Sequence, residues 1–123
     1  MSDRKNHQSL FKFSFALTTC FILISSFTPL YAKKQQELFS PIFLNEGIRF
    51  YKSGDLKSAI SSFSKSYSLS STDISTLLLL SQAYIKDGKP ELAVKTLQFA
   101  VKLYPNDALI HFFLGTAYKQ INN

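Results

Sequence analysis

The sequence has 123 residues, of which 46% are hydrophobic, and a formal net charge of +6. This length provides for one small domain rather than two. The basic residues are spread along the chain, without the clustered stripe that is typical of nucleic-acid binding, and the single cysteine excludes a cysteine-ligated zinc site.

The first 32 residues follow the order of a secretory signal peptide. Arg4 and Lys12 come before an uncharged apolar run at residues 13–27, and the small residue Ala32 precedes a polar segment. A basic start, an apolar core and a small residue at the cleavage position define such a leader. We therefore predict a signal peptide or signal anchor at residues 1–32, and export to the periplasm or out of the cell.

Two other interpretations of this segment stay open. Residues 13–32 make a stretch of 20 residues, which is long enough to cross a bilayer as a helix, so the segment would then remain as an inner-membrane anchor. The residues before Cys20 are also faintly similar to a lipid-attachment motif, although the apolar run continues past this cysteine. Contact with a membrane is expected through residues 13–32.

Residues 33–39 form a short polar lead-in, after which the pattern becomes helical. Ser40-Pro41 supplies an N-cap followed by proline at the first helical position, where the missing N–H costs nothing. Gly54-Asp55 ends one helix and begins the next, because glycine tolerates a left-handed turn and aspartate can cap. Similar punctuation recurs twice, and the predicted helices are about 41–52, 56–69, 74–86, 90–103 and 107–120.

The helical part repeats with a period of 34 residues. At this lag large side chains fall on large ones and small side chains on small ones. The aligned sets include Phe50, Tyr84 and Tyr118; Gly47, Ser81 and Gly115; Ala59 and Ala93; Phe63 and Leu97; Ser66 and Ala100. A fixed period of this length indicates stacked repeats, in which each helix pair buries its apolar face against its neighbours.

These positions resemble the tetratricopeptide repeat, a 34-residue pattern of aromatic, small and proline positions. Residues 74–107 match it most fully, with Tyr84 and Pro105 at two of its characteristic positions. The resemblance divides the chain into repeats at 40–73 and 74–107 and a half repeat at 108–123. It implies an all-α fold in which helical hairpins stack in a right-handed superhelix, an α-solenoid.

The same resemblance implies a binding groove along the first helix of each repeat, where related proteins hold a peptide or partner protein. Carried over by position, the groove has an apolar floor and a lysine at one end of each helix, which suits a peptide with an acidic end. The residues assigned to it are Leu44, Ile48, Tyr51, Lys52, Leu78, Gln82, Ile85, Lys86, Leu109, Phe112, Thr116 and Lys119. The alternative is that these side chains are ordinary helix surface and packing.

No candidate catalytic side chain has a neighbour in the sequence that would activate it. His111 lies at a repeat position that normally packs, and the serines of residues 61–71 form a polar face and a helix end. We therefore predict no enzyme activity, no cofactor and no metal.

The segment 108–118 is apolar almost all round, whereas a terminal repeat normally has a polar outer face. We expect a second copy, a partner protein or a membrane surface to cover it, unless the chain is a shortened relative of a longer repeat array. The predicted function is an exported protein–protein interaction scaffold. The alternative is a membrane-anchored subunit of an envelope assembly complex.

Overall fold

The computed structural model describes the backbone of residues 3–123 and the side chains of residues 28–123. The chain divides into two compact units, residues 1–35 and residues 36–123. In the part that is described, every regular element is a helix, as the sequence predicts. The helices are α1 (Asp3–Ser53), α2 (Leu56–Leu69), α3 (Ile74–Lys86), α4 (Pro90–Leu103) and α5 (Ala108–Ile121).

The predicted leader, residues 1–32, lies almost wholly outside the residues whose side chains are described, and so does Cys20. Across the described part of the chain, no helix is both long enough and apolar enough to pass through a membrane. Cleavage after Ala32, anchoring and export therefore stay predictions.

The breaks between the last four helices have the chemistry expected from the sequence. Gly54 and Gly88 adopt left-handed φ angles of 85° and 71°, which side chains with a Cβ rarely tolerate. Asp55 caps α2, because its carboxylate accepts a hydrogen bond from the backbone N–H of Ser58 at 3.1 Å. Hydrogen bonds from Ser58 hold the pKa of the Asp55 carboxyl below its ordinary value of 3.8. The helices α2 to α5 consequently begin and end within one residue of the predicted bounds.

The first helix differs from the prediction, because it already includes the polar lead-in and Ser40. Residues 33–38 are lysine, glutamine, glutamate and leucine, all of which have high helix propensity. Pro41 removes one backbone donor, and α1 continues through it. Ser40 is therefore not an N-cap. It is 6% exposed, and its hydroxyl lies 3.1 Å from that of Ser66 in α2.

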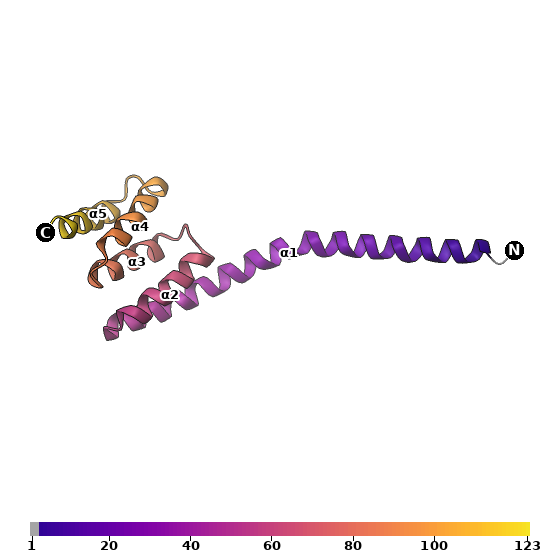
Figure 1. Ribbon diagram of the computed structural model, residues 1–123, viewed down its shortest axis with the longest axis horizontal. Coiled ribbons are helices and arrows are strands. Elements are labelled where there is room, and N and C mark those ends of the chain that lie inside the picture. The colour runs from indigo at the N-terminus through magenta and orange to yellow at the C-terminus, as the bar shows by residue number, and fades with distance from the viewer. Residues whose placement is uncertain (1–2) are drawn as a thin grey trace. The chain divides into compact units, whose positions relative to one another are not determined.

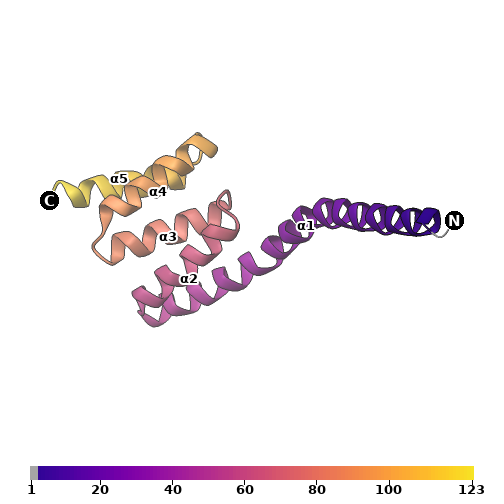
Figure 2. The same ribbon diagram turned by 45° about the vertical axis from the view of Figure 1, so that its right-hand side comes forward.

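Helix α2 runs back along the C-terminal part of α1, and α3, α4 and α5 follow it in successive layers (Figures 1 and 2). Two clusters of buried side chains hold these layers together. One forms around Ala59 and Phe63 of α2 and Leu80 and Ala83 of α3. The other joins α3, α4 and α5 through Leu77, Ala93, Val94, Leu97, Ala100, Ile110 and Ala117. Small residues thus sit beside large ones at each layer, which is the interlocking that the 34-residue period predicts.

Gly47 shows how close this packing is. A Cβ added to Gly47 would lie 3.1 Å from Cγ of the Phe63 ring and 2.5 Å from its Cε1. Carbon atoms in favourable contact are about 3.5–4.0 Å apart, so the ring occupies the space that a side chain at position 47 would need. Gly115 is its equivalent one half repeat from the end, and a Cβ added there would meet nothing within 4 Å. Position 47 is therefore covered by a neighbouring helix and position 115 is not.

Candidate functional site

One side of α1 carries a continuous stripe of side chains from residue 37 to residue 52. Its members are spaced three or four residues apart, which places them on one face of the helix: Glu37, Pro41, Leu44, Ile48, Tyr51 and Lys52. Leu44, Ile48 and Tyr51 are half-buried and pack against the cluster around Phe63, whereas Lys52 is exposed. The predicted groove residues of α1 therefore serve partly as packing and partly as surface.

The predicted residues of α3 continue this surface. Leu78, Gln82 and Ile85 are half-buried, and Lys86 is exposed in the last turn of the helix. The Nζ atom of Lys86 lies 4.8 Å from the centroid of the Tyr51 ring on α1. A lysine at this distance from an aromatic face makes a cation–π contact. The structure thus brings together two residues that the sequence assigned to the groove from different repeats.

The predicted residues of α5 are more open. Leu109 is 55% and Phe112 is 65% exposed, while Thr116 is half-buried and its hydroxyl donates to the carbonyl of Phe112. Lys119 is exposed near the end of the helix. Helix α5 packs against α3 and α4 only on its other side. Self-association through this helix stays a prediction, since nothing in the structure shows what covers it.

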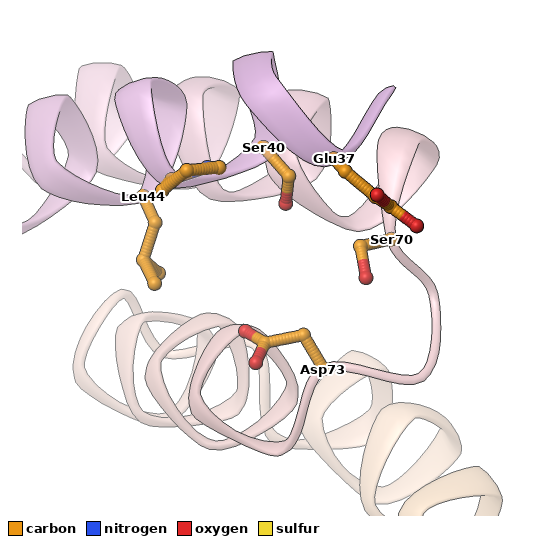
Figure 3. Close-up of a pocket in the computed structure, with 6 residues that line it drawn as sticks. Glu37, Ser40, Leu44, Ser70 and Asp73 are labelled. Atoms are coloured by element: carbon orange, nitrogen blue, oxygen red, sulfur yellow. The ribbon is translucent and has the colours of Figure 1, made fainter. Parts of the chain in front are cut away.

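A cavity of about 230 Å³ opens at the other end of the α1–α3 surface from the lysines. It is lined by Glu37, Ser40, Pro41, Leu44, Ser70 and Asp73. Figure 3 shows Leu44 and Asp73 pointing into the space between α1 and the start of α3, with Ser70 beside Glu37. Sequence reasoning missed this site. The signal that could have found it is the seven-residue spacing from Glu37 to Leu44, which puts a carboxylate on the groove face.

Asp73 is held in place by its own helix. Its Oδ2 atom accepts hydrogen bonds from the backbone N–H of Thr76 at 2.7 Å and from the Thr76 hydroxyl at 2.6 Å. This arrangement is the N-cap of α3.

Behind the cap lies a row of buried hydroxyl groups that links three helices. The Ser66 hydroxyl of α2 lies 3.0 Å from that of Thr76 and donates to the backbone carbonyl of Ser40 at 3.0 Å. Ser66 and Thr76 are fully buried, and Ser40 is nearly so. Because each of these buried hydroxyls has a partner, the row ties α1, α2 and α3 together and fixes the position of the Asp73 carboxylate.

His111 does not face another titratable side chain. Its Nε2 atom lies 2.7 Å from the backbone carbonyl of Pro105, and the ring is exposed at the turn before α5. Among the described residues, no three of the side chains that bind metals come together. The arrangement of α1 and α3, with an apolar floor between carboxylates and lysines, has instead the features of a surface that binds a polypeptide.

Comparison with known proteins agrees with the geometry. A model of the tetratricopeptide repeat family matches residues 50–123, which is more than half of the chain. No curated protein matches the sequence.

Proposed function

Because the chain belongs to the tetratricopeptide repeat family, we propose that it is an exported scaffold that binds an extended segment of another protein along α1 and α3. Repeats of this family are typically interaction modules without catalytic activity of their own. The observation that carries the proposal is the surface formed by Leu44, Ile48 and Tyr51 on α1 and by Leu78 and Ile85 on α3. We call it the α1–α3 groove.

The charge at the end of the groove supports an acidic group in the ligand. Lys52 and Lys86 are both exposed at the C-terminal ends of their helices. The ring of Tyr51 holds Lys86 beside the apolar floor, which places its ammonium group next to a path that a bound segment would follow. A carboxylate at one end of such a segment would pair with these lysines, while its apolar side chains cover the floor.

The test is a charge reversal at the lysines. The probe is a fluorescent seven-residue peptide with leucine at alternate positions and two glutamates at one end, titrated against the full chain. Two reversed charges at about 0.5–1 kcal/mol each predict at least a roughly tenfold weaker Kd for the variant Lys52→Glu/Lys86→Glu. The control Lys57→Glu/Lys95→Glu reverses two exposed charges on α2 and α4 and should bind as the wild type does. Unchanged binding by the groove variant would show that the groove assignment is wrong.

The compartment in which the scaffold acts is a separate proposal, supported by the order of residues 1–32. Removal of these residues would leave an exported protein that begins at Lys33. Retention would leave a subunit anchored in the inner membrane, with Arg4 and Lys12 on the cytoplasmic side. N-terminal sequencing of the protein from fractionated cells decides between them. A start at Lys33 is expected, and an intact N-terminus in the membrane fraction supports the anchored alternative.

A further inference from the structure

The two ends of the α1–α3 groove carry opposite charges. Glu37 and Asp73 line the cavity at one end, and Lys52 and Lys86 stand at the other. On each helix the acid and the lysine lie on opposite sides of the same apolar residues. The groove is therefore polar in the electrical sense along its length, and a ligand that pairs only with the lysines would leave the carboxylates unused.

The carboxylates are not accounted for by helix capping alone. Asp73 directs its Oδ2 atom to Thr76, and within the described residues its Oδ1 atom makes no hydrogen bond while the side chain points into the cavity (Figure 3). Glu37 lies within α1 rather than at its start, so it caps nothing. The hydroxyl row behind Thr76 fixes Asp73 before any ligand arrives, which reduces the ordering cost of binding.

The chemistry of the cavity favours an organic cation over a metal ion. A hard cation such as Ca²⁺ takes six to eight oxygen ligands, whereas this cavity offers two carboxylates, one of them partly engaged, and two serine hydroxyls. Its other walls are Pro41 and Leu44, which suit the methylene stem of a long basic side chain. A volume of about 230 Å³ far exceeds the space of a water molecule, which is about 30 Å³.

We propose that the cavity receives a lysine or arginine side chain of the bound segment, so that the groove selects a segment that is basic at one end and acidic at the other. This inference rests on the proposed function. The spacing follows from the helices. Residues 37 and 52 are 15 positions apart and residues 73 and 86 are 13 apart; at 1.5 Å per residue these are about 20–22 Å. An extended chain covers that distance in about six residues.

The probes are fluorescent peptides with one lysine and one glutamate separated by two to ten uncharged residues, with leucine at alternate positions, titrated against the full chain. We expect the tightest binding at five to six intervening residues, and at least a tenfold loss when the lysine of that peptide is replaced by alanine. In the variant Glu37→Gln/Asp73→Asn the same replacement should change affinity less than twofold. Asparagine caps a helix about as well as aspartate, so α3 stays intact.

The matched control is Glu91→Gln/Asp55→Asn, which also neutralises one exposed glutamate and one capping aspartate, but away from the cavity. It should retain the full dependence on the peptide lysine. If affinity depends on the peptide glutamate and on Lys52 and Lys86 but not on the peptide lysine, the cavity inference is wrong and the proposed function stands. If no peptide of the series binds, both are wrong.

Discussion

Replacing Gly47 with alanine would place a methyl group against the ring of Phe63. The added Cβ would lie 2.5 Å from Cε1 of the ring, about 1 Å inside a normal carbon–carbon contact. Phe63 is fully buried, and its ring lies beside that of Tyr51 with 6.5 Å between their centroids. The ring therefore cannot swing into solvent, and α1 and α2 must separate to accept the methyl group.

The size of the effect can be separated from helix propensity with a second glycine. Alanine is favoured over glycine in a helix by about 1 kcal/mol, and this gain applies to Gly47→Ala and to Gly115→Ala alike. Overpacking a core costs about 1–3 kcal/mol, and only the substitution at position 47 incurs it. We expect Gly115→Ala to raise the free energy of unfolding by about 1 kcal/mol and Gly47→Ala to lower it by up to about 2 kcal/mol.

Urea unfolding of the full chain, followed by circular dichroism, measures both values. The difference between the two variants is the cost of the contact with Phe63. The double variant Gly47→Ala/Phe63→Leu should recover part of that cost, because the smaller side chain leaves room for the methyl group and the two changes are then not additive. Equal stabilisation by both single variants would refute the claim that α2 closes over position 47. Equal destabilisation would mean that another surface covers position 115.

Two further predictions concern polar groups. Ser66→Ala should lower the free energy of unfolding by about 1–3 kcal/mol, because the hydroxyls of Ser40 and Thr76 would lose a buried partner; denaturant unfolding measures this, and no change would contradict the role of the hydroxyl row. Because the pKa of Asp55 is lowered in the folded state by Ser58, the stability from this group is complete above the ordinary value of 3.8 and is lost as the pH falls through the lower folded value. Unfolding measured between about pH 6 and pH 2 should therefore show a smaller acid loss for Asp55→Asn than for the wild type, and identical profiles would contradict the assignment.

The helical repeats could be predicted because local and long-range signals agree in them. Gly54 and Gly88 mark turns that need left-handed backbone, and the positions of Ala59 and Ala93 repeat at the spacing of the stacked layers. Each signal alone is weak, but chain punctuation and side-chain size point to the same helix ends. The contact of Lys86 with Tyr51 follows from the same register, since both residues were assigned to the groove before the structure was known.

The cavity could not be predicted because it depends on residues that local rules assign elsewhere. Ser40 before Pro41 has the appearance of a helix start, so the residues before it were interpreted as a lead-in and Glu37 was left out of the groove. The burial of Ser40 depends on Ser66, which is 26 residues away, and no short-range pattern reports such a pairing. Whether the remaining groove residues touch a ligand stays a prediction, because their half-buried positions fit packing as well as binding.

The row of hydroxyls distinguishes the two junctions between repeats. At the first junction the facing residues are Ser40, Ser66 and Thr76, and the residues 34 positions later at the second junction are Ile74, Ala100 and Ile110. Apolar burial weakens on cooling, whereas hydrogen bonds between hydroxyls do not depend on it. Low temperature should therefore loosen the C-terminal helix while the first hairpin stays docked to α3, so that one small protein would have a cold-sensitive end and a cold-tolerant one.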